Sequence, residues 1–144
     1  MYSDTLLALE RAHLLQIIVW GGASILVGAA LLAILAFQRV RSPLLSSFAL
    51  QCIAWGFVEA VLGWIRLRGA EHRDGAGALA LERLLWLNTG LDAGYATVGV
   101  TLVLTGWYLG RSGWLMGAGI GVIVHGLALL TFDLRFVLAL SPHV

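Results

Sequence analysis

The chain has 144 residues, of which 60% are hydrophobic and only 12% are charged. A soluble domain needs about 25% charged residues to cover its surface, so this composition predicts a membrane protein and argues against a soluble one. The formal charge is only +1, and no stretch has the clustered basic residues that nucleic-acid binding requires. The single cysteine, Cys52, excludes an intramolecular disulfide.

Four apolar stretches are each long enough to cross a bilayer core, which takes about 20 residues in a helix. We therefore predict an all-α integral membrane four-helix bundle, with residues 1–144 forming a single domain. The predicted spans are 14–37, 44–65, 84–108 and 114–132.

Signals at the ends of the spans predict how they begin and how they are joined. Leucines beside Asp4 and Glu10 predict a short N-terminal interfacial helix ahead of the first span. The second span is expected to begin at Ser42 and Pro43, because serine caps a helix and proline is tolerated in its first turn. The polar stretch 66–83 predicts a loop and then a short surface helix over 76–83. Residues 110–113 predict a tight turn.

Arginine placement indicates how the chain is oriented in the membrane. Four spans put both termini on one side, and that side carries more arginines than the other. Basic residues favour the cytoplasmic side, so we expect both termini in the cytoplasm. The richer side holds Arg11, Arg66, Arg68, Arg73, Arg83 and Arg135, and the other holds Arg39, Arg41 and Arg111.

Three ionisable side chains, Glu59, Asp92 and His125, fall inside the predicted spans. We call the membrane surface next to the 66–83 loop the loop side. At about 1.5 Å per residue, the three groups lie about 10, 13 and 15 Å in from it. An ionisable group at mid-bilayer costs about 2.5–3.5 kcal/mol by insertion scales. The three are therefore expected to pair with one another or to line a wet cavity.

Each of these groups shares a helix face with polar, aromatic or small residues, as the helical repeat of 3.6 residues shows. Turning these faces inward gives a bundle with a polar centre displaced toward the loop side. The companions are Trp55 and Arg66 for Glu59; Asn88 and Tyr95 for Asp92; Gly121 for His125; and, on the first span, Gln16, Trp20, Ala23 and Ser24.

Several roles are open for this intramembrane polar cluster. Buried polar groups often serve only as interhelical hydrogen bonds. Carboxylate and imidazole groups also form proton or ion pathways in membranes. One histidine with two carboxylates suits a metal ion, although no local ligand motif is present. Finally, Gly121 four residues before His125 resembles the tetrapyrrole-ligand motif of light-harvesting polypeptides.

Glycine pairs four residues apart predict close helix packing. Gly117 and Gly121 form one pair, and Gly90 and Gly94 form another. The second pair points away from the Asp92 face. It is therefore free for another helix, a second copy of the chain or a partner subunit.

The run from Asn88 to Tyr95, followed by Gly99, and the run from His125 to Asp133 resemble a group of small bacterial four-helix membrane proteins with no assigned function. The resemblance implies the same architecture, a bacterial inner-membrane location, and attention to Asn88, Asp92, Tyr95 and Asp133. Glutamine is common in that group at the position of His125, which disfavours a metal or tetrapyrrole role.

Asp133 falls at the loop-side end of the last span. There it is expected to pair with Arg66, Arg83 or Arg135, and such exposed pairs contribute little.

The role that best fits the sequence is a non-enzymatic membrane subunit that self-associates or joins a larger membrane complex. We predict neither catalytic residues nor a metal site. The alternative is a small proton-coupled transporter or ion pathway through Glu59, Asp92 and His125. A third possibility is a tetrapyrrole or metal site at His125.

Overall fold

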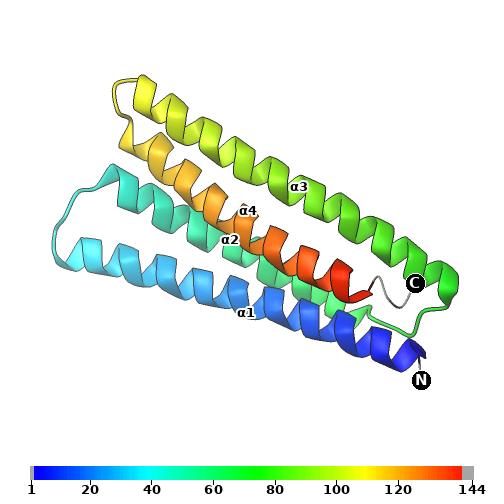
Figure 1. The fold of residues 1–144 in the computed structure, drawn as a ribbon. Coiled ribbons are helices and arrows are strands. Elements are labelled where there is room, and N and C mark those ends of the chain that lie inside the picture. Colours follow the sequence, from blue (N-terminus) through cyan, green and yellow to red (C-terminus); the bar gives the residue numbers. More distant parts are fainter. Residues whose placement is uncertain (1, 141–144) are drawn as a thin grey trace.

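A computed structural model describes residues 2–140 of the chain. Within them lie four helices, α1 (Tyr2–Phe37), α2 (Pro43–Arg68), α3 (Gly75–Tyr108) and α4 (Gly113–Leu140). They form the all-α four-helix bundle that the sequence predicts. Successive helices run in opposite directions, so the chain begins and ends at the same end of the bundle as the α2–α3 loop (Figure 1).

The helix boundaries follow the local sequence signals. The Ser42 hydroxyl accepts a hydrogen bond from the Leu45 N–H at 3.3 Å, which caps α2 as predicted. Asp74 caps α3 in the same way, with its carboxylate 2.8 Å from the Gly77 nitrogen. The turn before α4 reverses the chain through two residues with positive φ, Gly110 at 71° and Arg111 at 61°.

Three predicted boundaries are wrong. The N-terminal segment is not a separate interfacial helix, because α1 runs without a break from Tyr2 to Phe37. Its Leu6 is buried in an apolar cluster with Leu85 of α3 and Phe136 of α4. This packing, together with the absence of glycine or proline from residues 2–13, explains the continuity. Likewise, α4 continues to Leu140 instead of ending near 132. Residues 76–83 are not a separate surface helix, because α3 runs without a break from Gly75 to Tyr108.

The helices pack as two hairpins joined through α2 and α4. The most extensive interfaces are α3 with α4 and α1 with α2. Glycines set the closest approaches: a Cβ added at Gly21 would lie 2.5 Å from the Gly56 carbonyl oxygen, and one at Gly99 would lie 2.7 Å from that of Gly119. Since α3 lies along α4 and has little contact with α2, a space remains between α2 and α3.

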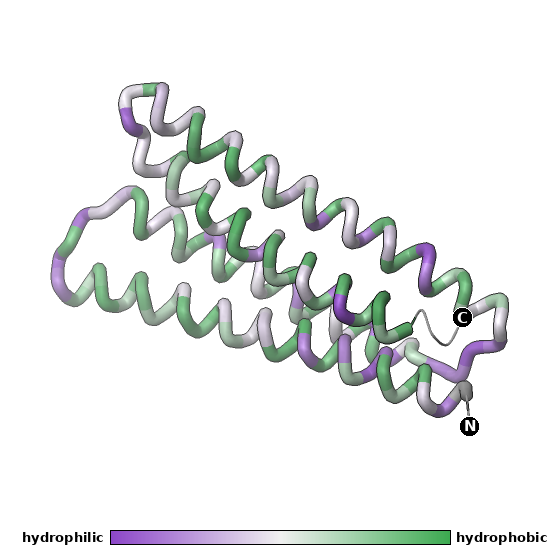
Figure 2. The backbone as a smooth tube through the Cα atoms, in the orientation of Figure 1, coloured by the Kyte–Doolittle hydropathy of each residue, from purple (hydrophilic) through white to green (hydrophobic). Residues whose placement is uncertain are grey.

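Among the described residues, α1, α2 and α4 are long and apolar enough to cross a membrane. Figure 2 shows apolar residues along most of the bundle and polar residues gathered at the loops and at the end that holds both termini. The α3 helix has comparable length but a more polar sequence, with Asn88, Asp92 and several threonines. Its antiparallel packing on α4 gives it the same extent through the bundle.

Candidate functional site

The centre of the bundle holds a buried acid–base pair between α4 and α2. His125 Nδ1 lies 2.8 Å from Glu59 Oε1, and both side chains are at least 96% buried. The second carboxyl oxygen, Glu59 Oε2, and the second ring nitrogen, His125 Nε2, are buried without a hydrogen-bond partner. The pair therefore leaves one acceptor and one imidazole nitrogen available inside the protein.

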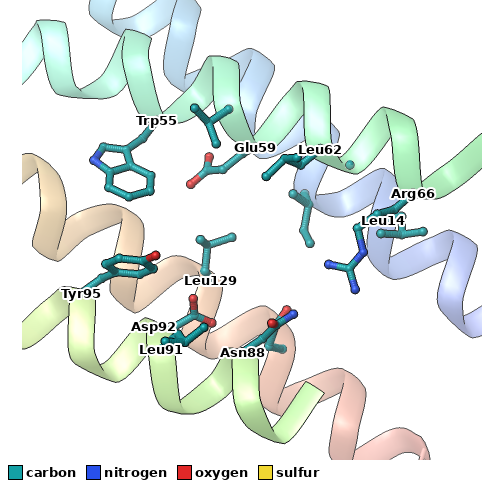
Figure 3. Close-up of a pocket in the computed structure, with 14 residues that line it drawn as sticks. Leu14, Trp55, Glu59, Leu62, Arg66, Asn88, Leu91, Asp92, Tyr95 and Leu129 are labelled. Carbon is teal, nitrogen blue, oxygen red and sulfur yellow. The ribbon is translucent and has the colours of Figure 1, made fainter. Parts of the chain in front are cut away.

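Asp92 of α3 faces the same region from the opposite wall. Glu59 and Asp92 line one cavity of about 250 Å³, and their carboxyl groups point toward it in Figure 3. Asp92 is 95% buried, and its Oδ2 atom has no partner. The structure thus places Glu59, Asp92 and His125 in one layer, as their spacing along the helices predicted.

The companions of these groups also reach the cavity. Asn88 and Tyr95 line it from α3, and Trp55 and Arg66 line it from α2 (Figure 3). Trp55 and Tyr95 meet edge to face across the cavity, with ring centroids 5.3 Å apart. The rest of the lining comes from Leu129 and Asp133 of α4, two apolar residues of α1, and Val58, Leu62, Gly63 and Leu91 of α2 and α3.

On α1, the predicted inward face is only partly correct. Trp20 lies edge-on to His125, with ring centroids 5.8 Å apart, and its Nε1 atom is buried without a partner. Ser24 is buried, but Gln16 and Ala23 are exposed. The inward stripe of α1 follows His13, Ile17 and Trp20, which lie at intervals of three and four residues.

A second buried pair lies closer to the loop-side end. His13 Nε2 is 3.1 Å from Asp133 Oδ1, and both side chains are at least 94% buried. This distance suits an ion pair, but the ring nitrogen is not aligned for a hydrogen bond. The expectation of an exposed arginine partner for Asp133 is therefore wrong. Sequence reasoning missed His13, although its position seven residues before Trp20 puts it on the same helix face.

A third pair reaches the surface at the same end. Arg73 donates from Nη2 to Glu10 Oε1 at 2.7 Å and from Nε to Oε2 at 3.0 Å. Hydrogen bonding to Glu10 raises the pKa of the Arg73 guanidinium, so it stays charged at physiological pH. Arg83 and Arg135 are exposed and do not line the cavity. Ionisable pairs thus extend from this surface to the middle of the bundle.

The site does not fit the metal or the tetrapyrrole considered for His125. Within the described residues, no three His, Cys, Asp or Glu side chains come together as a metal site would require. A flat ring would need open space over Gly121, but the Gln51 side chain fills it, 2.5 Å from where a Cβ on Gly121 would lie.

Residues 16–134 match the model of a family of unknown function, DUF6992. No curated protein and no solved structure matches the chain. The matched range includes Glu59, Asp92, His125 and Asp133 but not His13 or the Glu10–Arg73 pair.

Proposed function

The chain belongs to this family of unknown function, DUF6992, and we propose that it is a small non-enzymatic membrane subunit that pairs with a second copy of itself through α3. The apolar surfaces of α1, α2 and α4 support the membrane setting. We further propose a bacterial inner membrane with both termini in the cytoplasm, as the arginine placement favours.

An unpartnered face of α3 carries this proposal. At about 100° per residue, Gly90, Gly94, Thr97 and Thr101 form one stripe on the side of α3 opposite Asp92, and all four are exposed. No atom of a neighbouring helix lies within 4 Å of where a Cβ would be on Gly90 or Gly94. The threonine hydroxyls donate hydrogen bonds to carbonyl oxygens of their own helix, so they need no further hydrogen-bond partner in the bilayer.

The other glycines show how this chain uses small residues. Most of those inside the helices are packed against a neighbouring helix, so close that an added Cβ would meet its atoms within about 3 Å (Gly21, Gly28, Gly56, Gly63, Gly99, Gly106, Gly117, Gly119, Gly121 and Gly126). The Gly90–Gly94 pair has the four-residue spacing of the packed Gly117–Gly121 pair, but no neighbouring helix lies against it. Small residues four apart let two membrane helices approach closely, and a self-complementary stripe suits a two-fold symmetric contact.

Energy transfer between differently tagged copies in liposomes tests the pairing. We expect Gly94→Leu and Gly90→Leu each to weaken pairing at least about tenfold, equivalent to about 1.4 kcal/mol, because leucine separates the two backbones. Gly22→Leu is the matched control, since Gly22 is also open on its helix but lacks a small residue one turn away. Equal pairing in all three variants, or no pairing in the wild type, would refute the proposal.

A second candidate function is a proton pathway through Glu59, Asp92 and His125. The 2.8 Å contact between Glu59 and His125 favours it, as do the two further acid–base pairs toward the loop-side surface. The opposite half of the bundle carries no acid, histidine or arginine within its helices. The acid–base chain therefore reaches only one surface, and we rank this candidate second.

Reconstitution in liposomes with an internal pH-sensitive dye tests the pathway. We expect the wild type to carry protons across the bilayer and Asp92→Asn and Glu59→Gln to abolish that flux. Glu82→Gln is the control, because Glu82 is a carboxyl group of α3 that does not line the cavity. Unchanged flux in the two cavity variants would exclude the relay.

A further inference from the structure

The cavity between α2 and α3 carries more acidic than basic groups. Glu59, Asp92 and Asp133 line it, and among the described residues in its lining only Arg66, toward the loop-side end, is cationic (Figure 3). His13 lies against Asp133, and His125 lies behind Glu59. Glu59 Oε2 and Asp92 Oδ2 remain without partners, although both residues are at least 95% buried. Unsatisfied buried acceptors of this kind are rare and costly.

The entrance of the cavity is apolar. Val58 and Leu62 on α2 and Leu91 on α3 line it, and they are exposed by 44%, 54% and 50% respectively. These residues stand between the carboxyl groups and the outer surface of the bundle, at the depth of the hydrocarbon core if α2 crosses the membrane. A molecule dissolved in the bilayer would therefore meet the entrance directly.

One side of the cavity is aromatic. Trp55 and Tyr95 meet edge to face at 5.3 Å on the side away from Arg66. Aromatic faces attract organic cations as well as apolar groups. The cavity thus combines unpaired carboxyl oxygens, two aromatic rings and an apolar entrance, and each of these features suits one part of an amphipathic cation.

We propose that this cavity binds a lipophilic amine, a single cationic ammonium group on an apolar body that enters from the bilayer. The ammonium donates hydrogen bonds to Glu59 Oε2 and Asp92 Oδ2, which supplies the partners that these atoms lack. The apolar body extends past Leu62 and Leu91 into lipid. A fatty acid would place another carboxyl group beside the acidic side chains of the cavity, and an alcohol has one proton to donate to two acceptors.

Calorimetric titration of the protein in phosphatidylcholine nanodiscs tests the proposal, with protein-free nanodiscs subtracted. We expect decylamine at neutral pH to bind with a clear stoichiometry, and decanol and decanoate to bind at least about tenfold more weakly. Methylammonium has the same charge without the apolar body, and we expect it to bind at least about tenfold more weakly too. Equal affinity for decylamine and decanol would overturn the ammonium assignment. Equal affinity for decylamine and methylammonium would overturn entry from lipid.

Isosteric variants locate the site. Asp92→Asn and Glu59→Gln should each weaken decylamine binding at least about tenfold, while Glu82→Gln on the same helix as Asp92 should leave it unchanged. If either cavity variant loses its helical circular dichroism, Leu91→Trp replaces it, since Leu91 is exposed at the entrance and a larger side chain there blocks entry. Undiminished binding in Leu91→Trp and in a folded carboxyl variant would refute the proposal. Pairing through α3 does not depend on this result, because Gly90 and Gly94 lie on the opposite side of the helix.

Discussion

Replacing His125 by leucine perturbs the most deeply buried polar contact in the bundle. Glu59 has one hydrogen-bond partner, the His125 ring at 2.8 Å, and Glu59 Oε2 already has none. The substitution introduces an apolar side chain of similar volume and leaves both oxygens of the Glu59 carboxyl group without a partner. A double-mutant cycle with Glu59→Leu then isolates the coupling between the two side chains.

The expected coupling follows from burial and distance. Hydrogen bonds between membrane helices average about 0.6 kcal/mol and reach about 1.7 kcal/mol. The His125–Glu59 contact is short, both side chains are at least 96% buried, and neither has another polar partner. These features put it near the upper end of that range, so we expect a coupling of about 1.5 kcal/mol.

Reversible unfolding in mixed micelles, or steric trapping in bicelles, measures the free energy of unfolding for the wild type, both single variants and the double variant. Thr97→Val paired with Glu59→Leu is the control cycle, because the Thr97 hydroxyl bonds within its own helix on an exposed face. Additive effects of His125→Leu and Glu59→Leu, within about 0.5 kcal/mol, would refute the assignment of this contact as a stabilising pair.

Three further substitutions test the fold around the site. Gly56→Ala should lower the free energy of unfolding by about 1–3 kcal/mol, because its Cβ would lie 2.5 Å from the Gly21 carbonyl oxygen; an unchanged value would mean that the two helices are not in contact. Arg73→Gln removes both hydrogen bonds to Glu10 and should speed amide hydrogen exchange in the first turns of α1, whereas unaltered exchange would show that this ion pair does not hold them. Ser42→Ala should cost about 0.5 kcal/mol, since the cap bond is long at 3.3 Å and exposed, and a loss above about 2 kcal/mol would point to a role beyond capping.

Much of the fold follows from the length of the apolar stretches and from local helix signals. Ser42, Pro43 and residues 110–113 mark boundaries because their chemistry is local. The continuation of α1 through residues 2–13 and of α4 to Leu140 depends on packing between them, through Leu6 and Phe136. Contacts of that kind join residues far apart in the sequence, and hydropathy alone does not reveal them.

For the candidate site, the sequence predicts that its three ionisable groups lie at a similar depth, but not which of them pair. Helix rise places Glu59, Asp92 and His125 at similar depth whatever the order of the helices. Which of them pair depends on that order. His125 contacts Glu59 because α4 packs on α2. Asp92 faces this pair across a cavity because α3 does not pack closely on α2. The pairing of His13 with Asp133 required knowing that α1 extends as a helix to the loop-side end.

The most direct test of pairing through α3 is oxidative cross-linking in native membranes. The buried Cys52 is first replaced by serine, and a single cysteine is then introduced by Gly94→Cys or, as the control, Gly22→Cys. A disulfide requires Cβ atoms about 3.5–4.5 Å apart, a distance that a close contact between two α3 helices provides at residue 94. The proposal predicts a covalent dimer from Gly94→Cys and none from Gly22→Cys. The absence of a dimer in Gly94→Cys, or equal dimer formation at both positions, would contradict it.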